Sequence, residues 1–75
     1  MRGYLRTARR AQRLLIEAGV DARYADASLE TFPWHFVTPA VAAAYTRILR
    51  NRYPNAKSRE NLVGVVRRLV DQVAS

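Results

Sequence analysis

The sequence predicts a small all-α domain. Apolar residues recur at helical spacing in three separate stretches, two of these stretches begin at a good capping residue, and no stretch alternates apolar and polar side chains as a half-buried strand does. The chain has 75 residues, 49% apolar and 25% charged, which is the composition of one globular domain. We therefore expect residues 1–75 to form a single helical bundle of three long helices; a short fourth helix stays open.

The first helix is expected over residues 4–18. One face of its helical wheel is apolar and carries Tyr4, Leu5, Ala8, Ala11, Leu15 and Ala18. The opposite face carries a line of arginines, Arg2, Arg6, Arg9 and Arg13. Such a line is either a solvated outer face or a track for phosphates. Gly19 is expected to end the helix, because glycine adopts the left-handed conformation that follows a helix C-terminus.

The connection that follows is harder to interpret. Its alanine-rich first part, residues 21–30, is compatible with either a short helix or a loop. Pro33 then disfavours helical backbone at Phe32 and removes a hydrogen-bond donor. The aromatic side chains of Phe32, Trp34 and Phe36 are expected to fill the small core rather than to stack on bases.

Two further helices have clear starts. Thr38 is a good N-cap and Pro39 suits the first helical position, so a helix is expected from there to about Arg52, before a Tyr-Pro-Asn turn. Its apolar face carries Val41, Ala44, Tyr45, Ile48 and Leu49. The last helix is expected to begin with Ser58 as N-cap and Glu60 in its first turn. Its apolar face, expected to be buried, carries Leu62, Val65, Val66, Leu69, Val70 and Val73.

Charge is the most informative property of the composition. Lysine plus arginine number 13 against 6 acidic residues, which gives a net charge of +7. For a folded domain of this size, such a charge indicates a polyanion as the partner. The cations are unevenly distributed, and residues 1–16 contain arginines but no acid. Arginine suits nucleic acid because its planar guanidinium binds phosphates and guanine edges in a bidentate manner.

Residues that carry catalysis or hold cofactors are scarce. The chain has no cysteine, and its single histidine, His35, lies between large aromatic residues with no second ligand at metal-binding spacing. The glycines are scattered, so no phosphate-cradling loop is present. No apolar run reaches the about 18 residues of a membrane span. We therefore expect no catalytic, metal or cofactor site, no membrane partner and an intracellular location.

A series of motifs in the second half of the chain is specific enough to compare with a family. It consists of Phe32-Pro33-Trp34, Val37-Thr38-Pro39, the positions Val41, Tyr45 and Leu49, Ala56-Lys57-Ser58, and Leu62, Val65, Val66 and Arg67. Over residues 32–73 this series resembles the phage-type tyrosine recombinases, or integrases, and in particular their N-terminal core-binding domain, a SAM-like helical domain. The family often has a threonine where this chain has Asn61, so an amide replaces a hydroxyl there.

The resemblance implies a role in DNA integration and recombination. In that family this domain clamps one face of the recombination core site in double-stranded DNA. A catalytic domain of the same full-length chain clamps the other face, and other recombinase protomers act on the same DNA. The family's catalytic residues include a His-x-x-Arg motif, whereas His35 is followed at the third position by Thr38. The resemblance therefore implies a fragment without catalytic residues that ends near the interdomain linker, at Ser75.

The candidate DNA-binding residues are basic or polar residues of the expected helices. They are Lys57, Ser58, Arg59 and Asn61 at the start of the last helix, Arg67 and Arg68 further along it, Arg47 and Arg50 on the preceding helix, and Arg6, Arg9, Arg10 and Arg13 on the first. A helix N-terminus with a cap hydroxyl and flanking cations binds phosphate well. Asn61 and Arg68 lie on one line of the helix, where they suit an adenine and a guanine edge. The alternative for Arg68 is an ion pair with an acid such as Asp71.

Two other functional classes stay open. One is a stand-alone DNA-binding regulator of the helix-turn-helix type. The connection from Arg52 to Ser58 is longer than the usual three or four residues of that motif, which disfavours this class. The other is a protein- or membrane-interaction module that uses the basic first helix. The apolar face of that helix is mostly alanine, which is too weakly apolar for firm lipid insertion.

Overall fold

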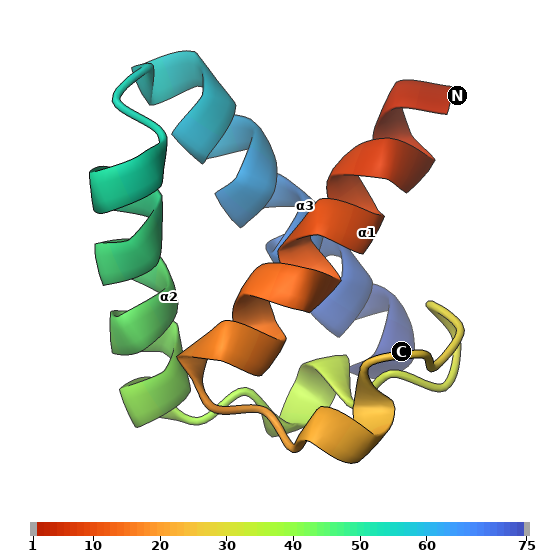
Figure 1. Cartoon of the computed structure of the whole chain (residues 1–75). Coiled ribbons are helices and arrows are strands. Elements are labelled where there is room, and N and C mark those ends of the chain that lie inside the picture. The colour runs from red at the N-terminus through yellow and green to blue at the C-terminus, as the bar shows by residue number, and fades with distance from the viewer. Residues whose placement is uncertain (1, 75) are drawn as a thin grey trace.

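The computed structural model describes residues 2–74 and is all-helical over that range, as predicted (Figure 1). The elements are, in order, α1 (Arg2–Ala18), the 3-10 turns η1 (Ala22–Tyr24) and η2 (Trp34–Phe36), α2 (Pro39–Arg52) and α3 (Ala56–Ala74). No strand occurs within the described residues. The result is a small helical bundle in which α1 crosses α3 and α2 stands beside them (Figure 1).

Helix α1 is the centre of the bundle, because it packs against both α2 and α3. Ala8 and Ala11 of α1 have no exposed area, so small side chains occupy this packed region. Leu15 and Trp34 are also fully buried. The other buried apolar side chains are Leu14, Phe32, Tyr45, Leu49, Leu62, Val65 and Leu69. The core therefore takes residues from all three long helices and from the connection between α1 and α2.

The predicted boundaries are confirmed at the end of α1 and at the start of α2. Gly19 has a φ of 133°, its amide donates to the Ile16 carbonyl at 3.2 Å, and the next amide donates to the Leu15 carbonyl at 3.0 Å. This pair of hydrogen bonds is the Schellman motif that ends a helix at glycine. At the start of α2, Thr38 Oγ1 accepts from the Val41 amide at 3.2 Å, so Thr38 is the N-cap.

The predicted start of the last helix is wrong. Helix α3 begins at Ala56, and Ser58 lies inside its first turn rather than at the cap. Asn55 is the cap, since its Oδ1 accepts from the Lys57 amide at 2.9 Å. Asparagine caps a helix as well as serine does. Capping at Asn55 instead of Ser58 makes the helix longer at its N-terminus. The connection between α2 and α3 is therefore only residues 53–55.

Side chains of α1, rather than a helix, hold the stretch 21–30. Only the single turn η1 forms there. Gln12 is 2% exposed, and its Nε2 donates to the carbonyls of Tyr24 and Ala27 at 3.3 and 2.8 Å. A buried amide is stable because both of its donors are satisfied in this way. The prediction missed Gln12, although its place beside the apolar face of the helical wheel was a usable signal.

The aromatic prediction is right for two residues and wrong for the third. Phe32 and Trp34 are buried, with ring centroids 4.5 Å apart, and Trp34 Nε1 donates to the Leu29 carbonyl at 2.7 Å. Phe36 is 71% exposed. Successive residues of a 3-10 turn point about a third of a turn apart, so Phe36 cannot share the direction of Trp34. Leu5, which the sequence places on the apolar face of the first helix, is 55% exposed because it lies at the edge of that face.

A buried hydroxyl links α2 to α3. Tyr45 is 5% exposed, and its hydroxyl donates to the Leu62 carbonyl at 2.9 Å. Burial raises the pKa of Tyr45 well above its ordinary value, with a smaller contribution from Tyr53, so the phenol keeps its proton and the hydrogen bond. On α3, Leu69 is buried as predicted, whereas Val66 is only half-buried.

An ion pair joins the ends of α1 and α2. The Arg52 guanidinium donates to both carboxylate oxygens of Glu17, at 2.6 and 2.7 Å. These hydrogen bonds lower the pKa of Glu17 and raise that of Arg52. Both side chains are exposed to solvent, so salt screens the interaction.

We predict that Leu69→Ala lowers the free energy of unfolding by about 2–4 kcal/mol, because it removes a side chain that is 7% exposed and leaves a cavity. Denaturant unfolding followed by circular dichroism measures this value. Val63→Ala on the same helix is the control; Val63 is exposed, and its loss should cost about 0.5 kcal/mol or less. Equal costs for the two substitutions would mean that α3 packs through another face.

We predict that Glu17→Gln flattens part of the pH dependence of stability. The folded-state pKa of Glu17 is lowered, so the ion pair contributes fully above the unfolded-state pKa, near 4.5, and its contribution is lost as the pH falls through the folded-state pKa. The stability difference between wild type and Glu17→Gln should therefore be larger near neutral pH than at about pH 3. Glu30→Gln, which removes an exposed carboxylate, is the control. An identical difference at both pH values would contradict the prediction.

Candidate nucleic-acid interface

The outward-facing side of α1 carries a group of arginines that we call the α1 arginine cluster. Its members are Arg6, Arg9, Arg10 and Arg13. They are exposed and line a shallow hollow of about 370 Å³ together with Leu5. Within the described residues, no carboxylate pairs with the arginines of this cluster. The cluster is therefore a concentrated positive surface without local neutralisation.

One member of the cluster has a structural role. The Arg9 guanidinium donates to Gln12 Oε1 at 3.3 Å and to the Ala27 carbonyl at 3.1 Å. It thereby reinforces the attachment of the connection to α1. The other three arginines make no such bond within the described residues, so they are available to bind an anion.

The predicted DNA-binding residues at the start of α3 differ in their exposure and in their hydrogen bonds. Lys57 is exposed, whereas Ser58 and Arg59 are half-buried. The Arg59 guanidinium donates to the carbonyls of Tyr53 and Pro54, at 2.9 and 3.0 Å. Arg59 therefore stabilises the turn between α2 and α3, and of these three residues only Lys57 presents an uncommitted charge to solvent.

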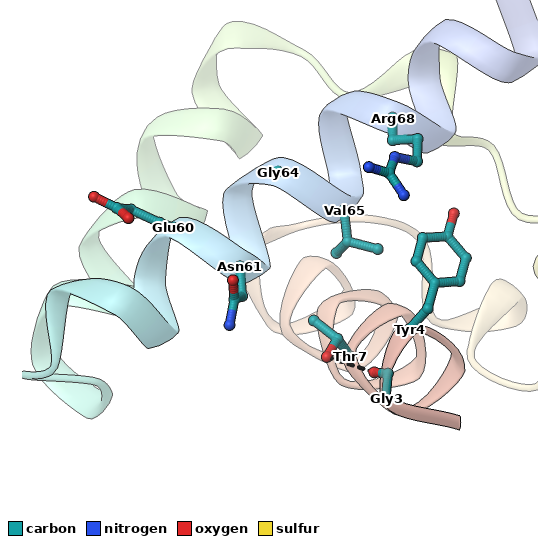
Figure 2. Close-up of a pocket in the computed structure, with 8 residues that line it drawn as sticks. All are labelled: Gly3, Tyr4, Thr7, Glu60, Asn61, Gly64, Val65 and Arg68. Atoms are coloured by element: carbon teal, nitrogen blue, oxygen red, sulfur yellow. Dashed lines mark hydrogen bonds between the residues drawn. The ribbon is translucent and has the colours of Figure 1, made fainter. Parts of the chain in front are cut away.

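A groove lies between the first turns of α1 and residues 60–68 of α3 (Figure 2). We call it the α1–α3 groove. It is lined by Gly3, Tyr4 and Thr7 of α1 and by Glu60, Asn61, Gly64, Val65 and Arg68 of α3, and its volume is about 430 Å³. A second hollow shares Gly64 and Arg68 with it and adds Arg67, Asp71 and Gln72. The groove thus continues along α3 past two adjacent arginines and one acidic residue.

The polar side chains of the groove come from both helices. The Arg68 guanidinium lies over the Tyr4 ring, 5.6 Å from its centroid, so the cation is held at the wall of the groove. The Tyr4 hydroxyl oxygen is buried and has no hydrogen-bond partner among the described residues. Figure 2 shows the Asn61 amide directed toward α1 and the Glu60 carboxylate directed away from Arg68. Arg68 therefore supplies the cationic group at one end of the groove, and Asn61 and Glu60 supply an amide and a carboxylate toward the other end.

The twelve predicted residues do not form one continuous surface. The α1 arginine cluster and the α1–α3 groove both take residues from α1, although no residue lines both hollows. Arg47 and Arg50 are exposed on the side of α2 away from its buried residues Tyr45 and Leu49. The structure thus divides the predicted residues between an α1–α3 surface and a separate surface of α2.

Other chemistry is sparse in the described part of the chain. His35 is exposed, and its ring centroid lies 4.0 Å from that of Phe36. No group of three histidine, cysteine or acidic residues that could hold a metal ion occurs among the described residues. No helix in the same range is long and apolar enough to cross a membrane. The groups that gather on the surface are guanidinium, ammonium and amide groups, which bind anions.

Comparison with protein-family models, with curated proteins and with solved structures finds no match for this chain.

Proposed function

We propose that this chain is a double-stranded DNA-binding domain. The observation that carries the proposal is the α1 arginine cluster, in which Arg6, Arg10 and Arg13 are exposed and have no carboxylate partner within the described residues. Like charges held this close repel one another, and a polyanion removes that cost. The net charge of +7 means that the domain as a whole also attracts a polyanion.

Phosphates provide the binding energy in this proposal. Arginines that neutralise DNA phosphates release condensed counterions, which makes binding favourable at low salt and independent of base sequence. Exposed Lys57 and Arg68 add cations on α3, and α3 packs against α1, so in this proposal the two helices contact the duplex together. Contacts of this kind position the domain, and base edges are then read by other exposed polar side chains.

More specifically, we propose that this DNA-binding domain is the core-binding domain of a site-specific tyrosine recombinase. The motif resemblance over residues 32–73 is the support, together with an all-helical bundle of the expected class. Several motif residues have structural roles, including Thr38 as the cap of α2 and Tyr45 as the link to α3. The source gene beyond codon 75 tests this level: a frame that encodes His-x-x-Arg and a later tyrosine supports it, and their absence overturns it.

A stand-alone regulator of the helix-turn-helix type is the second candidate, and the structure removes the argument against it. The connection between α2 and α3 is residues 53–55, which is within the range of that motif. In such a protein the second helix, here α3, enters the major groove. Both candidates bind duplex DNA, so they differ in whether a catalytic domain follows.

We predict that affinity for a random duplex of about 25 base pairs falls steeply with salt, with a log–log slope of about −0.9 per phosphate neutralised. The triple substitution Arg6→Gln, Arg10→Gln and Arg13→Gln should weaken binding and reduce the slope by about 2–3, because each removed arginine loses about one phosphate contact. Fluorescence anisotropy at several salt concentrations measures both quantities.

The matched control compares two single substitutions. Arg10→Gln removes an uncommitted cation, whereas Arg23→Gln removes one that lies 3.6 Å from the Asp21 carboxylate. Both change the net charge equally, so only Arg10→Gln should reduce the slope. A salt-independent affinity, absence of binding at low salt, or equal effects of the two substitutions would overturn the proposal.

A further inference from the structure

Two of the three glycines in the chain line the α1–α3 groove, one from each helix. The third, Gly19, is required by its positive φ. Gly3 and Gly64 have no positive φ, and a Cβ added to either would meet no atom within 4 Å. Glycine within a helix is less stable than alanine, so neither is explained by the fold. What the two share is the open space that they leave in the groove.

The walls of this space hold groups that an anion would satisfy. Arg68 presents a guanidinium at one end, and Asn61 presents an amide that points toward α1 (Figure 2). The Tyr4 hydroxyl is buried without a hydrogen-bond partner, which is a costly state for a polar group until an acceptor reaches it. These residues come from two helices and line one groove, with the Tyr4 hydroxyl on the side of Arg68 and Asn61 toward the other end (Figure 2).

We propose that the α1–α3 groove receives the sugar-phosphate backbone of one DNA strand. This inference rests on the proposed DNA-binding function and names the place of closest approach. A concave groove fits the convex ridge of the backbone, whereas base edges at the bottom of a DNA groove are reached by a protruding helix face. Gly3 and Gly64 let the backbone approach both helices closely.

Arg68 contacts a phosphate in this arrangement rather than a guanine edge. Its guanidinium leaves the Tyr4 ring for the phosphate, and the Tyr4 hydroxyl then donates to the same anion. Lys57 extends the contact, because Lys57, Asn61, Gly64 and Arg68 follow one line of α3 at helical spacing. The Glu60 carboxylate is directed away from Arg68, so it does not oppose the phosphate at that end (Figure 2).

The decisive experiment fills the groove without changing charge. Gly64→Leu should weaken binding to a random 25-base-pair duplex by about tenfold, because its side chain occupies the space of the backbone. Val63→Leu, the neighbouring exposed position outside this groove, should bind as wild type does. Gly64→Ala should melt at or above the wild-type temperature and still bind less tightly, which separates loss of binding from loss of folding. Wild-type affinity in both Gly64 variants would overturn the inference.

Two further variants test the groups on the walls. Tyr4→Phe keeps the ring beneath Arg68 and removes only the hydroxyl, and it should weaken binding about twofold to threefold without loss of stability. Arg68→Ala should weaken binding equally for a random duplex and for the best duplex selected from a random library. A loss confined to the selected duplex would mean that Arg68 reads a base and would overturn the inference.

The outcomes separate this inference from the proposed function. If wild type does not bind duplex DNA, the proposed function itself is wrong. If wild type binds and the α1 arginine variants lose affinity while Gly64→Leu does not, DNA-binding stands and only the groove assignment fails. Circular dichroism and thermal melting of every variant establish that each comparison uses folded protein.

Discussion

Helix α1 contacts α2 and α3 at once, in a region where Ala8 and Ala11 have no exposed area. Small residues at a helix crossing let backbones approach closely, and a thin core needs that closeness to exclude water. The larger side chains Leu15 and Trp34 are fully buried in the same core cluster. Because one face of α1 meets this packing requirement, the opposite face is free to carry arginines. The positive surface is thus a consequence of how the core is built.

Polar contacts, rather than regular structure, hold the connection between α1 and α2. Gln12 and Arg9 bond to backbone carbonyls of that segment, and Trp34 bonds to the Leu29 carbonyl. A segment with few helical hydrogen bonds must find partners for its buried carbonyl groups elsewhere. Here the partners are side chains that anchor the segment to α1 and place Trp34 in the core. This explains why a connection with only two 3-10 turns still packs as part of the domain.

Sequence patterns predicted correctly those parts of the fold that depend on interactions between residues close together in the chain. The three long helices, the Gly19 terminus and the Thr38 cap follow from spacing and capping within a few residues. The predictions failed where the outcome depends on distant partners or on competing options. Asn55 and Ser58 are comparable caps, and only the helix itself shows which one is used. Of the candidate site, exposure was predictable for most cations, but the sequence could not reveal that Arg59 bonds to Tyr53 and Pro54, or that Arg68 lies over Tyr4.

Acidic and basic residues are unevenly distributed along the chain. Four of the six acidic residues lie at the end of α1 and in the connection that follows, namely Glu17, Asp21, Asp26 and Glu30. Residues 1–16, by contrast, contain five arginines and no acid, so positive charge is concentrated on α1. A body with unevenly distributed charge is oriented by the field of a polyanion before contact, so the surface with the α1 arginine cluster turns toward the polyanion. Repulsion among the arginines that destabilises the free domain is relieved in the same encounter, and binding and stability are therefore coupled.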